Sequence, residues 1–195
     1  MIETHPLKPF LPENAQLLML GSFPPPKNRW KMDFYYPNYQ NDMWRMLGFI
    51  FFNDKEHFLN LSQKNFKQTE IENFLQDKGI AIFDTAYRIE RLQNNASDKF
   101  LQVVEATHIE HLLEQIPLCH SIVTTGDKAT DTLVSQLPQG TAKPKIGDIQ
   151  HNPHCYSANR DLYLYRMPST SRAYPLALEK KADMYRPLFQ KLNML

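Results

Sequence analysis

The chain has 195 residues, a formal net charge of +1 at neutral pH and two cysteines, Cys119 and Cys155. A charge so close to zero argues against a protein that coats nucleic acid non-specifically, although a locally basic groove is compatible with it. Two cysteines without a C-x-x-C spacing exclude a four-cysteine zinc or iron–sulfur site, and we expect buried thiols in a reducing cytosol.

The length predicts one domain spanning residues 1–195, in which the proline-containing residues 1–14 form an extended lead-in. The N-terminus lacks a charged region followed by an apolar run, and no apolar stretch approaches the length of a membrane span. We therefore expect a cytoplasmic protein without a membrane partner.

Short apolar runs alternate with helical patterns along the chain. The runs that predict buried strands are 17–20, 80–83, 121–124 and 162–165. Apolar residues at helical spacing predict helices over 42–52, 107–116, 127–137 and 176–192, with one or two more within 56–74. Residues 87–100 are polar and rich in turn formers, and 138–154 indicate a loop with a short pairing segment near 146–149.

This alternation predicts an α/β fold, a single-domain three-layer α/β/α sandwich around a central, mostly parallel four-stranded sheet. Each predicted strand ends in small or polar residues, namely Gly21-Ser22, Asp84-Thr85, Thr125-Gly126 and 167–171. Because the carboxyl ends of parallel strands meet at one edge of a sheet, we expect these loops to form a single pocket.

The loop after the first predicted strand is long, aromatic and basic. It contains Lys27, Arg29, Trp30, Lys31, Phe34, Tyr35, Tyr36 and Tyr39, and it closes at Asn41-Asp42. A small domain rarely places so many rings and cations on one loop for packing alone, so this loop is predicted to be the wall of a binding site.

Four motifs follow one another along the chain. They are L-G-S-F-P-P-P at 20–26 with F-Y-Y-P-N-Y-Q-N-D-M-W-R-M-L-G at 34–48, G-I-A-I-F-D-T at 79–85 with N-A-S at 95–97, T-T-G-D-K-A at 124–129, and M-P-S-T-S at 167–171. In this order and spacing they resemble the uracil-DNA glycosylase superfamily, and most closely its branch of mismatch-specific and hypoxanthine-DNA glycosylases.

The resemblance implies a monofunctional DNA repair enzyme. Such enzymes flip a deaminated base, uracil or hypoxanthine, out of the DNA and hydrolyse its N-glycosidic bond to leave an abasic site. The implied partner is DNA that contains a deaminated or mismatched base, the implied state is a monomer, and neither a metal nor an organic cofactor is required.

Residue by residue, Gly21-Ser22-Phe23 matches the loop that activates water in this superfamily. The uracil-specific branch has an Asp where Phe23 stands, and the mismatch branch has an Asn, so Phe23 cannot perform that step and is assigned to base binding. The hypoxanthine branch is thought to use an Asn later in the motif, which matches Asn41. Asn41 is therefore the candidate for placing the water or contacting the sugar, and Ser22 for contacting the water or the base.

The remaining matches concern the base and the DNA backbone. Phe34 and Tyr35 match the wall on which the flipped base stacks, and Asp84 stands where the uracil-specific enzymes have a base-reading Asn. Met167 replaces the His donor of those enzymes. The residues assigned to DNA binding are the phosphate-pinching loop, the wedge position and two loop cations, that is Ser169, Thr170, Ser171, Arg172, Lys27 and Arg29.

Each assignment has a structural alternative. Asn41 stands directly before a predicted helix and could act as its cap, alone or in addition to a chemical role. Asp84 could cap a turn, the aromatic residues could belong to the core, and the serines after Pro168 could form an ordinary turn.

Other classes of protein fit less well. The segment His151 to Cys155, H-N-P-H-C, lacks the ligand spacing of a zinc site, so no metal site is expected. The absence of a P-loop, a Rossmann glycine fingerprint and a G-x-S-x-G motif disfavours an unrelated hydrolase or nucleotide-binding protein. A non-catalytic module that binds damaged or single-stranded DNA stays open, because Phe23 and Met167 replace polar catalytic residues.

Overall fold

The computed structural model describes residues 1–92, 100–155 and 160–195. Its central sheet has the strand order β5-β2-β8-β10-β9. The strands are β2 (Leu17–Gly21), β5 (Ile80–Asp84), β8 (Ser121–Thr125), β9 (Ile149–Cys155) and β10 (Arg160–Met167). The four predicted strands run parallel, and β9 adds a fifth that pairs antiparallel with β10.

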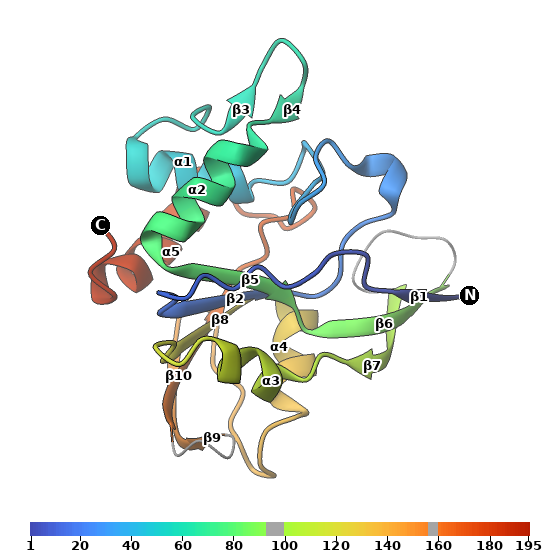
Figure 1. Ribbon diagram of the computed structural model, residues 1–195, viewed down its shortest axis with the longest axis vertical. Helices are drawn as coiled ribbons and strands as arrows, with labels where there is room; N and C mark the ends of the chain where they lie inside the picture. Colours follow the sequence, from blue (N-terminus) through green and yellow to red (C-terminus); the bar gives the residue numbers. More distant parts are fainter. Residues whose placement is uncertain (93–99, 156–159) are drawn as a thin grey trace.

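Helices cover both faces of this sheet, which confirms the predicted three-layer α/β/α sandwich. Figure 1 shows α1 (Met43–Phe52), α2 (Gln68–Lys78) and α5 (Leu178–Lys191) on one face, and α3 (Ile109–Gln115) and α4 (Asp127–Val134) on the other. Every residue of β2, β5 and β8 is buried, as the continuous apolar runs predicted for strands covered on both faces.

A second, three-stranded antiparallel sheet corrects the expectation for two segments. Its strands are β1 (Ile2–Thr4), β6 (Ala86–Arg91) and β7 (Leu101–Ala106), in the order β1-β6-β7. The lead-in therefore begins as a strand, and β6 and β7 occupy the segment expected to be polar and rich in turns. The apolar side chains of this sheet are few, because it packs on a small core around Phe23 and Ile89, and register shifts between β6 and β7 interrupt their alternation. The motif residues Asn95–Ser97 lie outside the described residues.

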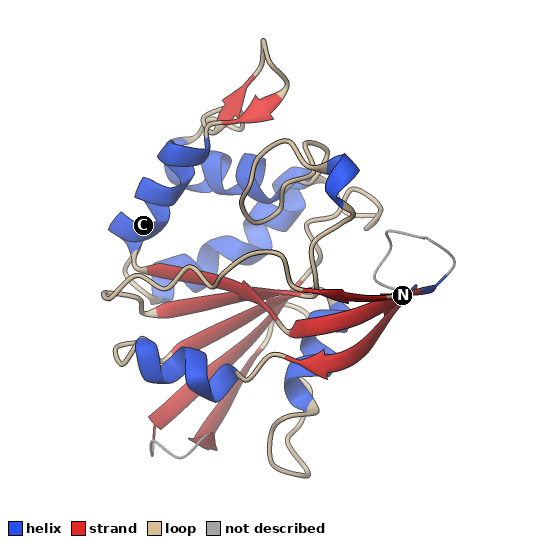
Figure 2. Ribbon diagram, turned by 45° about the vertical axis from the view of Figure 1, so that its right-hand side comes forward, coloured by secondary structure: helices blue, strands red, loops and turns tan. Residues whose placement is uncertain are grey.

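A further difference lies before α2. The residues expected to form one or two helices within 56–74 begin instead with a short hairpin, β3 (Leu59–Asn60) and β4 (Asn65–Phe66), which stands out from the body in Figure 2. The apolar residues that suggested a helix anchor the hairpin, since Phe58, Leu59 and Phe66 are all buried in the main core. No helix among the described residues is long and apolar enough to cross a membrane.

A buried ion pair joins the start of α1 to two segments near the C-terminal end of the chain. Lys181, on the inward face of α5, is fully buried and donates to Asp42 Oδ2 and to the backbone oxygen of Ser171, at 2.9 Å in each case. Asp42 directly precedes α1, and its backbone N–H donates to the oxygen of Thr170 at 2.9 Å. The pair thus ties the loop after β10 to the start of α1 and to α5.

We predict that Lys181→Met lowers the free energy of unfolding by roughly 3–5 kcal/mol, because it leaves the Asp42 carboxylate buried with only the more distant Arg172 as a partner. Chemical denaturation measures the effect. Lys180→Met, at the exposed neighbouring position, is the matched control and should change stability by no more than about 0.5 kcal/mol. Equal stabilities of the two variants would show that the buried pair does not hold these segments together.

Candidate active site

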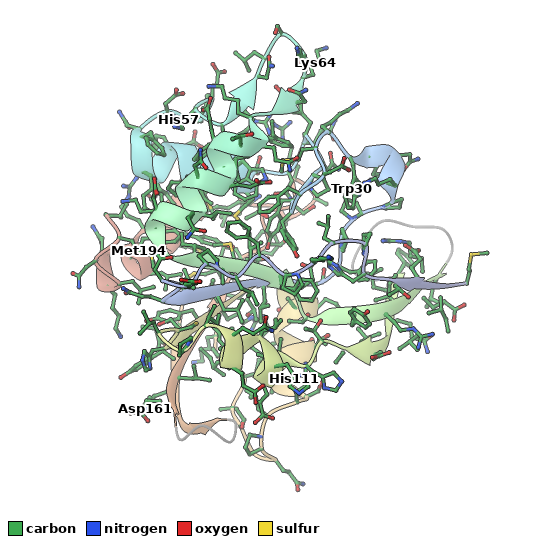
Figure 3. All side chains as sticks on the ribbon, in the orientation of Figure 1. Trp30, His57, Lys64, His111, Asp161 and Met194 are labelled. Carbon is green, nitrogen blue, oxygen red and sulfur yellow. The ribbon has the colours of Figure 1, made fainter. Side chains whose placement is uncertain are left out.

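The loops at the carboxyl ends of β2, β5, β8 and β10 surround one pocket, as expected from the parallel sheet. The space is about 150 Å³, comparable to a cavity that accepts a single aromatic ring. It is lined by Gly21, Ser22, Phe23, Pro24, Pro25, Arg29, Tyr35, Tyr36, Pro37, Asn38, Asn41, Asp84, Thr125, Ser169, Thr170 and Ser171. Trp30, labelled in Figure 3, marks the outer part of the aromatic and basic loop that supplies one wall.

Most of the residues that the sequence singled out therefore line a common space, and three do not. Phe34 is buried in the main core, where it packs against Phe10 and Trp44. Lys27 is exposed, pairs with Asp33 at 2.5 Å and lies over the ring of Trp30. Arg172 lies beside the start of α1 instead of in the pocket, with its Nε 3.4 Å from Asp42 Oδ1. These placements give no support to base stacking by Phe34.

Asn41 contacts the start of α1, whose N-cap is Asp42, and also lines the pocket. Its Oδ1 accepts the backbone N–H of Met43, in the first turn of α1, at 2.9 Å. This contact fixes the orientation of the amide, because the oxygen has to face the N–H donor. The amide nitrogen therefore points elsewhere with both of its hydrogens, and the oxygen keeps a second lone pair.

Asp84 is buried at the end of β5, and its two carboxylate oxygens have different surroundings. Oδ2 lies 2.9 Å from Nε2 of His5, a residue of the lead-in that the sequence reading did not single out. Oδ1 lies above Gly21, such that a Cβ at residue 21 would stand 2.3 Å from it. The backbone oxygen of Asp84 accepts the hydroxyl of Thr107 at 2.7 Å, which further fixes this strand end.

Three aromatic residues form one wall of the pocket. Tyr35 is almost fully buried, and its hydroxyl donates to the backbone oxygen of Lys8 at 2.7 Å. Burial, with a smaller contribution from the charge of Asp84, raises the pKa of Tyr35 far above its ordinary value. Tyr36 has a positive φ of 49° and places its hydroxyl 2.8 Å from Thr125 Oγ1, which joins this wall to the end of β8. Phe23 also lines the pocket, although its side chain packs mainly in the small second core.

The loop after β10 presents hydroxyl groups at the pocket. Ser169 Oγ accepts the N–H of Ser171, and Ser171 Oγ accepts the N–H of Ala173, both at 3.2 Å. A hydroxyl that accepts from the backbone keeps its own hydrogen for another acceptor. Ser169 also packs closely over Gly126, where a Cβ would lie 3.3 Å from the serine Cβ.

The lining is weakly charged and offers no place for a metal. Among the described side chains that line the pocket, only Arg29 and Asp84 carry a full charge. No group of three or more His, Cys, Asp or Glu residues in the described part of the chain could hold a metal ion.

Sequence reasoning missed His5 and assigned no individual role to Tyr36, Asn38 or Thr125. Tyr36 and Asn38 lie inside the recognised motif, and Thr125 lies in a predicted strand-end loop, so their positions were available and only their roles were not assigned. His5 had no signal, because it comes from a segment expected to have little structure of its own.

Comparison with known proteins bears on the fold. No protein-family model matches the chain, and no curated protein matches its sequence. Among solved structures, the chain is similar to a protein from Methanosarcina acetivorans that was solved by NMR in solution and is provisionally named a uracil DNA glycosylase. The TM-score is 0.65 at 20% sequence identity, over 99% of each chain. A likeness at this identity establishes the shared fold, and it confirms the fold predicted from the motifs.

Close packing between Gly21 and Asp84 generates a prediction about stability. Gly21→Ala should lower the free energy of unfolding by about 1–3 kcal/mol, because the added methyl group overlaps Asp84 Oδ1. In an Asp84→Ala background the same change should have less than half of this effect, since the overlapping atom is gone. A double-mutant cycle by chemical denaturation measures the coupling, and additive effects would contradict the described contact.

The buried tyrosines predict a loss of stability at high pH. In the unfolded chain a tyrosine ionises at about pH 10, whereas folded Tyr35 keeps its proton to higher pH because burial raises its pKa. Above about pH 10 the unfolded state therefore binds fewer protons than the folded state, and stability falls as the pH rises. Denaturation between pH 8 and pH 11 should show a shallower fall in Tyr35→Phe than in the wild type. Tyr87→Phe, at an exposed position, should leave the slope unchanged, and equal slopes in all three proteins would contradict the burial of the Tyr35 hydroxyl.

Proposed function

We propose that this protein is a DNA glycosylase that binds a deaminated base, uracil or hypoxanthine, in the strand-end pocket and hydrolyses its N-glycosidic bond. The observation that carries the proposal is the convergence of Ser22, Asn41, Asp84 and the serine loop on one ring-sized space. The motif resemblance and the fold shared with the Methanosarcina acetivorans protein support the same reaction class. The mismatch-specific and hypoxanthine branch is the closest in motif.

The pocket suits a flat heterocycle that has left the base stack. Its walls combine the rings of Phe23, Tyr35 and Tyr36 with the polar groups of Asn41 and Asp84. Aromatic faces stack on any base, whereas hydrogen bonds at the edge of the ring distinguish one base from another. We assign stacking to the aromatic residues and base reading to Asn41 and Asp84.

The charge of Asp84 limits how a base can lie. A carboxylate repels the oxygens of a base that departs with negative charge, so Asp84 must face a ring N–H, which it can accept as a hydrogen bond. The amide hydrogens of Asn41 supply donors for an oxygen of the base or sugar, where negative charge develops in the transition state. Asn41 and Asp84 thus provide complementary contacts for one lactam edge.

Hydrolysis needs a water placed on the sugar. The Asn41 oxygen has a lone pair beyond the one that caps α1, and the Ser22 hydroxyl lies in the same lining, so we assign the water to these two groups. The water oxygen bonds to C1′ as the bond from C1′ to the base nitrogen breaks, and the proton released by the water ends on the departing base. The described lining contains no lysine amine, which fits hydrolysis without a covalent enzyme intermediate.

Polar groups at the rim of the pocket are assigned to contacts with the DNA backbone. The hydroxyls of Ser169 and Ser171 accept backbone N–H groups and so keep their own hydrogens for phosphate oxygens. Arg29, which is exposed and lines the pocket, adds a positive charge on the opposite loop. We assign Thr170 to the same loop and place Lys27 and Arg172 as outer contacts, farther from the flipped nucleotide.

The test is a cleavage assay on oligonucleotides that contain one uracil, hypoxanthine, xanthine or mismatched thymine, followed by alkaline strand scission at abasic sites. The wild type should release at least one deaminated base. Asn41→Ala should slow this release roughly 100-fold, by analogy with the loss of a single group that stabilises the transition state.

Two further variants separate chemistry from helix capping. Asn41→Asp keeps an oxygen that can cap α1 but removes the amide hydrogens, so it should fold normally and still be slow. Asn14→Ala removes an asparagine that donates to Gln76 near the opposite edge of the sheet, and it should cleave like the wild type. A folded wild type that binds these oligonucleotides but cuts none of them would instead support a non-catalytic DNA-binding module.

A further inference from the structure

His5 is a buried histidine that contacts the proposed base-reading residue. Its side chain is fully buried, and three rings surround it, with centroids at 4.4 Å for Phe83, 5.3 Å for Phe23 and 6.2 Å for Tyr35. The backbone N–H of His5 donates to the oxygen of Tyr87 at 2.8 Å, which fastens the residue to β6. The imidazole is therefore fixed in position by packing and by the backbone.

An ionised Asp84 carboxylate can only accept, so its contact with His5 requires a hydrogen on Nε2. Nδ1 lies 3.2 Å from the backbone nitrogen of Leu7 and 3.0 Å from its oxygen. A neutral ring can accept the Leu7 N–H at Nδ1 and carry its hydrogen on Nε2, while a charged ring can donate to the Leu7 oxygen and again carry a hydrogen on Nε2. In both states Nε2 donates to Asp84 Oδ2, at 2.9 Å.

Other charged and titratable groups lie on both sides of this pair. On the pocket side they are Tyr35, Tyr36 and Arg29. A separate cleft borders His5 on the other side of the lead-in, and its ionisable residues are Lys8, Tyr87, Glu105, His108 and His111. Among the described residues, His5 is the side chain that hydrogen-bonds to the Asp84 carboxylate.

We propose that His5 is a positioning residue that holds the Asp84 carboxylate through Oδ2 and leaves Oδ1 as a fixed acceptor for the ring N–H of a bound base. The inference deepens the proposed function and rests on it. It brings the N-terminal lead-in into the site, since His5 supplies a donor to this carboxylate.

A fixed acceptor at this point selects bases by a simple chemical difference. Deamination converts the ring nitrogen beside the amino group, an acceptor in cytosine and adenine, into an N–H donor beside a carbonyl in uracil and hypoxanthine. A carboxylate that is held as an acceptor binds the N–H and is opposed by the lone pair of the parent base. His5 is thus inferred to support discrimination against the undamaged bases, without touching the base itself.

The test compares oligonucleotides with uracil or hypoxanthine against the same oligonucleotides methylated at the N3 or N1 ring nitrogen, respectively, for wild-type protein and two variants. The wild type should release the unmethylated base at least roughly 10-fold faster. His5→Phe, which keeps an aromatic ring but has no donor, should slow the unmethylated substrate by roughly 10- to 100-fold and bring the ratio close to one. His5→Gln restores an N–H donor and should recover most of the rate and of the ratio.

His57→Phe is the matched control, because His57 stacks on Phe52 at 3.7 Å and does not line the pocket. It should leave the rates and the ratio unchanged. If His5→Phe slows the methylated and unmethylated substrates equally, His5 has only a structural role and the proposal is overturned.

A second readout does not depend on catalysis. The NMR signal of the His5 imidazole should show a hydrogen on Nε2 in the folded protein at neutral pH, and Asp84→Asn should shift this signal, whereas the exposed change Asp183→Asn should not. The proposal is overturned if the His5 ring has no hydrogen on Nε2, or if the His5 signal is the same in the wild type and in Asp84→Asn. Should no oligonucleotide be cut, the proposed function fails while the NMR result still decides whether His5 holds Asp84.

Discussion

The buried ion pair between Lys181 and Asp42 is the contact on which the geometry of the site depends. It joins the C-terminal helix to the residue that follows Asn41, and the same Lys181 nitrogen also binds the backbone oxygen of Ser171. A single ammonium group therefore fixes the distance between two walls of the pocket, the start of α1 and the loop after β10. A buried pair of this kind is a weak source of net stability, but its geometry is specific. Neither the Lys181 ammonium nor the Asp42 carboxylate has an equally close partner of opposite charge elsewhere among the described residues.

A second polar pair holds the opposite side of the pocket. His5 fixes Asp84 at the end of β5, and the absence of a side chain on Gly21 leaves room for its other oxygen. Between the two pairs lies a wall of rings joined to β8 by the contact between Tyr36 and Thr125. The four parallel strands bring the loops together, and these polar contacts set the orientation of the groups within them, which a hydrolytic site requires before a substrate binds.

The sequence was sufficient for the four parallel strands of the central sheet because strands covered on both faces are continuous apolar runs, as in Leu17–Gly21 and Ile80–Asp84, whereas the edge strand β9 formed in a segment expected to be mainly loop. The small sheet was missed because its strands contain few apolar residues without a regular alternation, and because β1 pairs with β6 from far along the chain. Strand-end loops located most of the pocket, yet the partner of Asp84 could not be read from the chain, since His5 is distant in sequence and stands in an irregular segment. Lys181 did leave a signal, because a lysine that precedes Ala182 and lies one turn before Tyr185, on the buried face of a helix, needs a charged partner.

The central claim is that a single base occupies the strand-end pocket, and a structure of the complex tests it most directly. We would determine the structure of the protein bound to an oligonucleotide that contains 2′-fluoro-deoxyuridine or its hypoxanthine counterpart, in which the fluorine slows hydrolysis. The account predicts that the base lies in the pocket with its ring N–H at Asp84 Oδ1, and that the neighbouring phosphates contact Ser169 and Ser171. An empty pocket, with the modified base stacked in the DNA or the DNA bound on another face, would contradict it.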